Sequence, residues 1–382
     1  MNKILSIVIP SYNMQDYLPA CLDSLVVDDP ALFAALDIIV VNDGSKDKTS
    51  AIAHEYVAQH PDVIRALDKP NGNYGSCVNR GLAEARGVFI KVLDADDTFD
   101  TTAFKQFIRR LLESEEKNEQ VDLFLTDFVW LNAAKRPTTR IRLDLPAEKV
   151  LALDDVPHLK PIAMHTFTYR VHMLRASGYR QTEGISYTDL EWACYPVLAV
   201  KRLCYLPLPV YRYLTARPGQ TMEPERFYVQ DLPMRRRVAL GMVARLAQTG
   251  ATLSPAAHHY LLGWALWMVE GVYLSAILIR PDPRTSAFLS AFDADVARLA
   301  PAFHAQLMAH DLRTGLLKLP FGRLWACARD TGAPSLRLLR FYLRCEGRAC
   351  GLAGRVKRLL RRCAGSRPAP RRLQAMLLET IG

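Results

Sequence analysis

The sequence has few features of zinc fingers, disulfide scaffolds or nucleic-acid-binding proteins. None of its eight cysteines forms a CxxC pair or lies near histidines at zinc-finger spacing, so we expect reduced thiols in a cytosolic protein. We find no internal repeat and no RNA- or DNA-binding motif. Half of the 382 residues are hydrophobic and 23% are charged, which indicates an ordinary globular protein with a sizeable core.

Long apolar runs are also scarce. Residues 1–10 form a short apolar run that contains Pro10, which predicts a buried strand rather than the hydrophobic region of a signal peptide. Residues 261–279 have about the length of a membrane span, but Glu270 near the centre would be costly in hydrocarbon. We therefore expect a buried helix of a C-terminal bundle there, with a spanning helix as the alternative.

Positive charge is concentrated at the C-terminal end. Residues 313–382 contain 16 basic and 3 acidic residues, a net +13, so the other 312 residues carry −3 of the total of +10. Basic residues alternate there with Leu, Phe and Tyr at helical spacing, as in RVKRLLRR. This pattern fits an amphipathic helix on an anionic membrane surface or an exposed face of a helical bundle, and both interpretations stay open.

The first hundred residues alternate apolar strands with helical stretches. We expect strands at 4–10, 37–42, 63–67 and 88–93, and helices at 14–25, 47–59 and 74–85. Nearly all-apolar strands in this rhythm predict an α/β fold with a mostly parallel, Rossmann-like sheet flanked by helices.

The later part of the chain becomes helical. Strands are expected at 121–131 and 201–214, and helices at 225–248, 256–279 and 286–310. We predict a catalytic domain over 1–222, a helical domain over 223–315 and a basic helical tail over 316–382.

Polar residues follow three of the predicted strands. They are Ser11-Tyr12-Asn13, Asn42-Asp43-Gly44-Ser45 and Asp94-Ala95-Asp96-Asp97. Ligands of open α/β sheets bind outside the carboxyl ends of the strands, so these residues are expected to meet at one binding edge.

The carboxylates of Asp94 and Asp96 predict a cation site. Mg²⁺ and Mn²⁺ favour a few carboxylates together with phosphate oxygens, and such an ion would offset the charge on a departing diphosphate. The structural alternative is a helix N-cap. Asp43 at its strand tip is expected to accept hydrogen bonds from a base or ribose, with a simple turn and capped helix as the alternative.

The stretch from Asn71 to Arg80 reads NGNYGSCVNR. Its glycines allow close backbone approach and it leads into a helix N-terminus, which favours anions. Arg80 is a candidate phosphate ligand because its guanidinium forms paired hydrogen bonds. An ordinary loop with a surface Arg is the alternative.

Together these segments resemble the family 2 glycosyltransferases, which have the GT-A fold. The resemblance is carried by SIVIPSYNMQDYLPACLDSL, DIIVVNDGSKDKT, NGNYGSCVNRGLAEARG and FIKVLDADD, in this order over roughly residues 4–100, and it extends more loosely to about 222. It implies an inverting enzyme of bacterial envelope or exopolysaccharide synthesis that uses a nucleotide-diphospho-sugar, commonly a UDP-sugar, with Mn²⁺ or Mg²⁺.

The resemblance also implies roles for individual residues. Asp94 and Asp96 would serve ribose, diphosphate and metal, and Arg217 lies in a segment that would close over the diphosphate, although a plain domain linker explains it equally well. The expected nucleotide-sugar-binding residues are Pro10, Tyr12, Asp43, Asn71, Asn79, Arg80, Asp94, Ala95 and Arg217.

A general base is implied in the later motif YTDLEW, at residues 187–192. The family commonly has Glu-Asp where this chain has Thr188-Asp189, so Asp189 is the expected base, with Glu191 as the second candidate and a helix cap as the structural alternative. Such a carboxylate removes the proton that keeps an acceptor hydroxyl from being a good nucleophile. His165 is a weaker candidate for contact with acceptor or metal.

The expected acceptor is a glycan or lipid-linked glycan, and the expected location is cytoplasmic or peripheral on the inner face of the plasma membrane. The QxxRW motif of processive synthases is absent after Asp189, which favours single additions. The alternatives are an inactive sugar-nucleotide-binding scaffold and a protein that binds nucleic acid through its basic tail, although we expect no nucleic acid as a partner. A nucleotidyltransferase is disfavoured because no Gly-rich loop with Arg and Lys follows the first strand.

Overall fold

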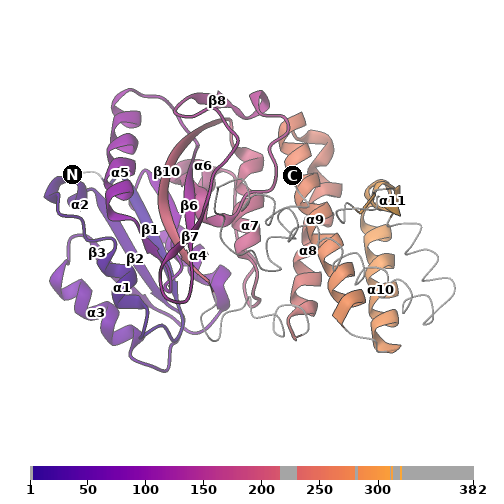
Figure 1. The fold of residues 1–382 in the computed structure, drawn as a ribbon, viewed down its shortest axis with the longest axis horizontal. Coiled ribbons are helices and arrows are strands. Elements are labelled where there is room, and N and C mark those ends of the chain that lie inside the picture. Colours follow the sequence, from indigo (N-terminus) through magenta and orange to yellow (C-terminus); the bar gives the residue numbers. More distant parts are fainter. Residues whose placement is uncertain (1–2, 216–229, 280–282, 310, 313–318, 321–382) are drawn as a thin grey trace, which may run out of the picture. The chain divides into compact units, whose positions relative to one another are not determined.

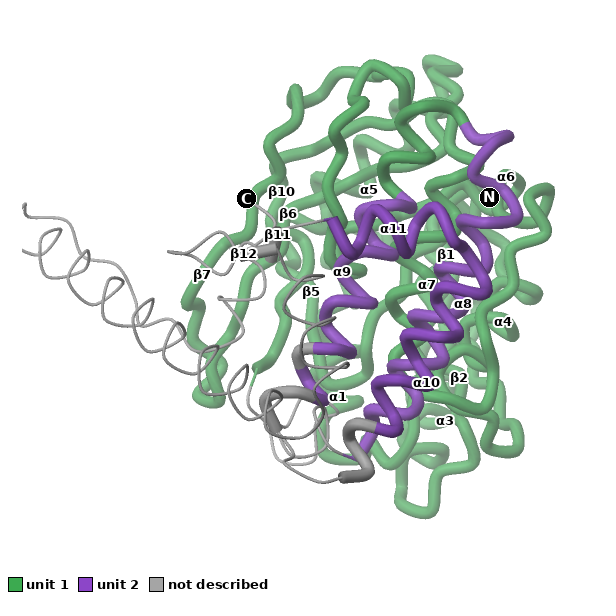
Figure 2. Tube along the Cα trace, turned by 90° about the vertical axis from the view of Figure 1, so that its right-hand side faces the viewer, with its two compact units in different colours: residues 1–220, 254–260 green, residues 221–253, 261–382 purple. Residues whose placement is uncertain are grey.

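A computed structural model describes residues 3–215, 230–279, 283–309, 311–312 and 319–320 (Figure 1). The chain divides into two compact units (Figure 2). Unit 1 comprises Met1–Gln220 and Ser254–Tyr260, and unit 2 comprises Thr221–Leu253 and Leu261–Gly382. Arg217 and all of the basic tail except residues 319–320 lie outside the described residues, so the expectations for them stay predictions.

Unit 1 is built on a ten-stranded sheet in which eight strands follow the order β3-β2-β1-β4-β9-β6-β10-β5, β7 pairs with β6 and β8 pairs with β10. The strands are β1 (Leu5–Ser11), β2 (Leu36–Asn42), β3 (Ile64–Asp68), β4 (Phe89–Val92), β5 (Thr98–Phe99), β6 (Leu123–Leu131), β7 (Pro137–Ile141), β8 (Val150–Ala152), β9 (Phe167–Arg170) and β10 (Arg202–Leu214).

The expected parallel sheet is confirmed for one half. Strands β3, β2, β1 and β4 pair in parallel, and β6 and β10 are also parallel to each other. The second half is mixed, because β9 lies antiparallel between β4 and β6 and the short strands β5, β7 and β8 add antiparallel edges. Residues 163–170 carry no long apolar run, so the sequence pattern did not reveal β9.

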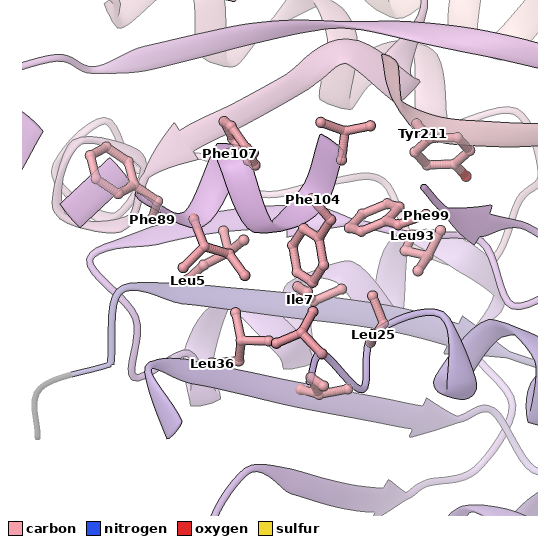
Figure 3. Close-up of a cluster of buried hydrophobic side chains, with 14 of the residues drawn as sticks. Leu5, Ile7, Leu25, Leu36, Phe89, Leu93, Phe99, Phe104, Phe107 and Tyr211 are labelled. Carbon is pink, nitrogen blue, oxygen red and sulfur yellow. The ribbon is translucent and has the colours of Figure 1, made fainter. Parts of the chain in front are cut away.

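Helices cover both faces of the sheet. In Figure 3, Phe104 and Phe107 of α5 (Thr101–Glu116) pack over Leu5 and Ile7 of β1. Alternate side chains of a strand point to opposite faces, so Val8 lies on the other face, where Gly81 of α4 (Asn73–Glu84) approaches it closely. The other helices of this unit are α1 (Leu18–Asp23), α2 (Pro30–Ala34), α3 (Thr49–Gln59), α6 (Val171–Ala176) and α7 (Asp189–Cys194).

The amino ends of the central strands are closed by a buried polar network. Asp37 accepts hydrogen bonds from the hydroxyl of Ser6 (2.6 Å) and from the guanidinium of Arg65 (2.7 and 3.0 Å). The backbone N–H of Arg86 donates to the same carboxylate (3.0 Å). These groups satisfy one another, so their role is structural.

Unit 2 is mainly helical in its described part, which also contains a short antiparallel pair of strands, β11 (Asp311–Leu312) and β12 (Leu319–Pro320). It contains α8 (Leu232–Thr249), most of α9 (Pro255–Ile279), α10 (Pro283–Leu299) and α11 (Pro301–Ala309). The single helix expected over 286–310 is two helices, because Pro301 has no N–H to continue the hydrogen-bond ladder and instead opens the next helix. No helix of the described residues is both long and apolar enough to cross a membrane.

Candidate active site

The parallel strands bring their carboxyl ends to one edge of the sheet. Ser11 of β1 is level with Asn42 of β2, which is level with Asp68 of β3. On the other side of β1, Val8 pairs with Val92 of β4, two residues before Asp94. The polar segments that follow these strands therefore emerge side by side, as the sequence pattern predicted.

The loop after β1 is fastened to the turn after β2. Five hydrogen bonds of 2.7–3.1 Å join the two segments. They run from Asn13 N to Ser45 Oγ, from Met14 N to Thr49 Oγ1, from Gln15 N to Asp47 Oδ2, from Lys46 N to Asn13 Oδ1 and from Lys48 N to Gln15 Oε1. Ser45, Asp47 and Thr49 thus do more than begin a helix, because they hold the neighbouring loop in place.

Tyr12 lies at the start of this fastened loop. It is 46% exposed, and no other large hydrophobic residue is exposed in the part of the chain that the structure describes. Pro10, two residues before Tyr12, is buried within β1. An exposed aromatic ring on a fixed loop can stack on the face of a planar ligand.

Asp43 is buried and organises the loop after β3. Its Oδ1 accepts hydrogen bonds from Lys69 Nζ and from Gly72 N (2.9 Å), and its backbone oxygen accepts one from Asn71 Nδ2 (3.0 Å). The Lys69 ammonium also donates to Ser76 Oγ (2.8 Å). Asp43 and Asn71 therefore shape this edge of the site.

Helix α4 is tied to the segment that precedes α7. Asn79 donates to Gln181 O and to Glu183 Oε1 and accepts from Gln181 N, each at 2.8 Å. Arg80, in contrast, is 52% exposed and pairs with Glu84 one turn further along the helix. The amide of Asn79 thus holds the segment 181–183 and the guanidinium of Arg80 is paired within its own helix, so their expected contact with a nucleotide-sugar stays a prediction.

A chain of hydrogen bonds surrounds the carboxylates after β4. Tyr74 of α4 donates to Asp94 Oδ1 (2.8 Å), and Asp94 N donates to the hydroxyl of Tyr211 on β10 (3.1 Å). That hydroxyl donates in turn to Asp97 Oδ2 (2.7 Å), while Leu214 N donates to Asp97 Oδ1 (2.7 Å). Both oxygens of Asp97 therefore anchor β10. Ala95, which lies between Asp94 and Asp96 in the sequence, is buried.

The charges of Asp94, Asp96, Asp97 and Asp189 raise the pKa values of nearby tyrosines. Burial and the charges of Asp94 and Asp189 raise the pKa of Tyr74 well above its usual value. Burial also raises the pKa of Tyr213, and the charges of Asp97, Asp94, Asp96 and Asp189 add to that shift. Asp189 is some ninety residues from Asp94 in the sequence, yet the charges of both raise the pKa values of Tyr74 and Tyr213.

Asp189 is the first residue of α7, and Thr188 occupies the N-cap position. Burial raises the pKa of Asp189 to about 6, although hydrogen bonds from the backbone N–H groups of Leu190 and Asp189 lower it. Glu191 is buried and accepts a hydrogen bond from Thr182 N (2.7 Å). Of the two acidic residues of this motif, Asp189 is thus better suited to exchange a proton near pH 7.

His165 lies beside the carboxylates after β4. A ring nitrogen of His165 and carboxylate oxygens of Asp94 and Asp97 all lie within 4.8 Å of one another. Burial and the charge of Lys91 lower the pKa of His165 to about 3, so the imidazole is neutral near pH 7 and has a lone pair to offer. The structure thus groups Asp94 with Asp97 and His165, whereas the sequence led us to expect Asp94 with Asp96 as metal ligands.

Three residues of this region were not identified from the sequence. Tyr74 and Tyr211 bond directly to the strand-end carboxylates, and Lys91 is a fully buried lysine on β4. Lys91 carried a signal, because a lysine inside the apolar run VFIKVL is unusual for a buried strand. The tyrosines carried none, since Tyr211 comes from a strand more than a hundred residues later.

Comparison with known proteins gives one consistent family. Residues 6–164 match the sequence model described as Glycosyl transferase family 2. An uncharacterized glycosyltransferase of Mycoplasma pneumoniae, the MG025 homolog, is 41% identical over 105 residues, which are 27% of this chain and 34% of that protein. The uncharacterized glycosyltransferase EpsJ of Bacillus subtilis is 33% identical over 151 residues, 40% of this chain and 41% of that protein. The chain thus aligns with less than half the length of each of these two relatives.

Among solved structures, residues 1–349 of TarS from S. aureus have a similar fold. The TM-score is 0.61 at 19% sequence identity, over 89% of this chain and 91% of that one. The same part of TarS in complex with UDP-GlcNAc gives a TM-score of 0.58. The architecture is therefore that of a GT-A protein with a helical C-terminal region.

Proposed function

Because residues 6–164 match the sequence model of the family 2 glycosyltransferases, we propose that this chain transfers a sugar from a nucleotide-diphospho-sugar to a hydroxyl group of a glycan or lipid-linked glycan, with inversion at the anomeric carbon. A UDP-sugar is the proposed donor. The observation that carries this proposal is the position of Asp94 at the common edge of the strand ends, where Tyr74 donates a 2.8 Å hydrogen bond to it and the charge of Asp189 also raises the pKa of that tyrosine. It supports one site that has donor-binding carboxylates and a base.

The donor would lie along the edge formed by the strand ends. Tyr12 is exposed on a fastened loop, where its ring would stack on the nucleobase. The remaining polar atoms of Asp43 and the backbone around Asn71 would contact base and ribose. Asp94 and Asp96 follow β4, where the diphosphate would be positioned.

A divalent cation fits the residues after β4, since carboxylate oxygens and a ring nitrogen of His165 are suitable ligands, and the buried Nδ1 of that ring has no hydrogen-bond partner among the described residues. When bound, such an ion offsets the negative charge that develops on the departing diphosphate. The protein residues do the rest of the chemistry. Tyr74 fixes the orientation of Asp94 through its 2.8 Å hydrogen bond.

Asp189 would act as the general base. Its carboxylate would remove the proton of the acceptor hydroxyl as that oxygen attacks the anomeric carbon on the face opposite the diphosphate. The bond between the anomeric carbon and the diphosphate oxygen breaks, and the nucleoside diphosphate leaves with inversion. A pKa of about 6 keeps Asp189 ionised at neutral pH while it remains a stronger base than an exposed aspartate.

The first experiment is a panel of UDP-, GDP- and TDP-sugars, tested for binding and slow hydrolysis with and without Mn²⁺. Wild type is compared with Asp96→Ala. We expect one donor to bind and to release its nucleotide only with metal, and the substitution to abolish this release. An absence of binding by every donor under every metal condition would leave the inactive scaffold or a tail-dependent nucleic-acid-binding protein as the better interpretation.

A further inference from the structure

The segment just before β9 carries the imidazole nearest to the strand-end carboxylates. His165 lies in a single 3₁₀ turn, Met164–Thr166, immediately before β9. Its ring is enclosed by three aromatic rings, with centroid distances of 4.9 Å to Phe128, 4.7 Å to Tyr211 and 4.6 Å to Tyr213. This enclosure fixes the plane of the imidazole next to Asp94.

The position of the turn is fixed by a second contact. Lys91 is fully buried on β4, and its ammonium donates to the carbonyl oxygens of His165 (2.7 Å) and Phe167 (3.2 Å). Strands β4 and β9 pair only at Phe89–Arg170 and Ile90–Tyr169, so the side chain of Lys91 joins them where the ladder ends. Strand β4 thus leads directly to Asp94 and also holds His165 in place through Lys91.

We propose that Asp94 and His165 together form a mixed oxygen–nitrogen site for a divalent cation, with the imidazole nitrogen as a direct ligand. This inference rests on the proposed function and deepens it, because the ion concerned would be the one that faces the donor diphosphate. The expected pair Asp94 and Asp96 contains oxygen ligands only, whereas this site adds a nitrogen.

The spacing of the ligand atoms is close to what such an ion requires. A cation about 2.1 Å from each ligand atom separates neighbouring ligand atoms by about 3 Å and opposite ones by about 4.2 Å. The ligand atoms of Asp94, Asp97 and His165 lie within 4.8 Å of one another. Nδ1 of His165 is buried and has no hydrogen-bond partner among the described residues, a condition that a metal or a bridging ligand would relieve.

Asp97 is the least suitable ligand of the three. Its two oxygens already accept hydrogen bonds from Tyr211 Oη and Leu214 N, both at 2.7 Å. To coordinate an ion it would have to weaken the bonds that anchor β10. Asp97 therefore anchors β10 beside the site, and Asp94 and His165 contribute the ligand atoms.

A nitrogen ligand has a consequence for metal preference. Mg²⁺ is held by oxygen ligands and water in octahedral sites, whereas imidazole is a common ligand of transition-metal ions. The site should therefore bind Mn²⁺ more tightly than Mg²⁺. Replacement of the imidazole by a carboxylate should reduce or reverse this preference.

The test is pulsed electron paramagnetic resonance of the full chain loaded with MnCl₂, with and without UDP, together with Mn²⁺ and Mg²⁺ titrations. Wild type is compared with His165→Asn, His165→Asp and His54→Asn. His54 is a matched control because it is an exposed histidine, paired with Asp68, outside the site. Circular dichroism of each variant verifies folding.

We expect a ¹⁴N hyperfine coupling to Mn²⁺ in wild type and in His54→Asn, and its loss in His165→Asn with at least about a 10-fold weaker Mn²⁺ affinity. His165→Asp should shift the preference toward Mg²⁺. Absence of the coupling in wild type, or unchanged Mn²⁺ binding by His165→Asn, overturns the inference. If wild type lacks the coupling but hydrolyses a donor with metal, only the nitrogen ligand is excluded and the proposed function stands. If neither UDP nor any donor binds, the proposed function fails as well.

Discussion

The hydroxyl group of Tyr211 donates a hydrogen bond to Oδ2 of Asp97 across 2.7 Å. The same hydroxyl accepts a hydrogen bond from the backbone N–H of Asp94 (3.1 Å). Through one phenolic oxygen, strand β10 is joined to both ends of the segment that carries the strand-end carboxylates. The position of Asp94 therefore depends on a residue more than a hundred positions later.

Tyr211→Phe should lower both stability and activity. The substitution leaves the buried carboxylate of Asp97 without one donor and Asp94 N without its acceptor, a loss of about 1–3 kcal/mol in the free energy of unfolding. Urea denaturation measures this loss, and donor hydrolysis measures the effect on Asp94. Tyr205→Phe is the control, because Tyr205 makes a similar bond to buried Asp127 (2.6 Å) earlier on β10. A loss of activity as large in the control as in Tyr211→Phe would contradict the link to Asp94.

Asp189→Asn should lower kcat by about 10²–10⁴-fold while donor affinity is retained, because the base is lost and the donor contacts are not. In wild type, kcat/KM should fall as the pH drops through about 6, since protonated Asp189 accepts no proton. Steady-state kinetics between about pH 5 and pH 8 measures the profile.

Glu191→Gln provides the contrasting variant. Glu191 accepts a hydrogen bond from Thr182 N inside the protein, so its substitution should lower stability and leave the acidic limb of the pH profile in place. A profile that loses this limb in Glu191→Gln and keeps it in Asp189→Asn would assign the base to Glu191.

Tyr12→Ala should weaken UDP binding. Stacking of a base on an aromatic ring contributes about 1–3 kcal/mol, so the Kd should rise by roughly 10-fold or more. Isothermal titration with UDP measures the change. Tyr12→Phe retains the ring and should bind nearly as wild type does; equal binding by the alanine variant would show that Tyr12 does not contact the base.

Gly75→Ala should destabilise unit 1. A Cβ atom at Gly75 would lie 2.0 Å from the backbone oxygen of Thr182, so α4 or the segment before α7 would have to move. We expect a loss of more than about 2 kcal/mol in the free energy of unfolding. Gly178→Ala is the control, because its Cβ would meet no atom within 4 Å and only its positive φ of 67° would cause strain. Equal losses in the two variants would rule out the close approach as the cause.

Lys91 should make stability depend on pH above neutrality. Burial lowers the pKa of Lys91 from its usual value of 10.5 to about 7, so between these values the unfolded chain binds a proton that the folded chain does not. Stability contributed by this group therefore rises with pH through that window and is lost as pH falls toward about 7. Urea denaturation of wild type and Lys91→Met from about pH 7 to about pH 10 should show the difference shifting in favour of wild type. A difference that stays constant with pH would mean that Lys91 is charged throughout.

The sequence was most informative where function depends on local pattern. Apolar strands followed by Ser11, Asn42 and Asp94 were enough to predict a parallel half-sheet and a common polar edge, because register between parallel neighbours brings strand ends together. The strand pattern did not point to Asp189. Its place in this site was expected only from the family resemblance.

The remainder depends on contacts between distant segments. Asn79 and Arg80 were both expected to bind the nucleotide-sugar, yet the amide of Asn79 is used by residues 181–183 and the guanidinium of Arg80 pairs with Glu84. The periodicity of a sequence does not predict which of two adjacent helical side chains contacts a loop a hundred residues away. The short antiparallel strand β9 was missed for the same reason, because its partners β4 and β6 are determined by tertiary packing.

The five hydrogen bonds between residues 13–15 and 45–49 have a kinetic consequence. A loop that is already held in its final shape need not be ordered when a nucleotide arrives, so the orientation of Tyr12 is present in the free protein. Association of the nucleotide should then approach the diffusion-controlled rate, and amide hydrogen exchange in these two segments should be slow before binding and change little afterwards.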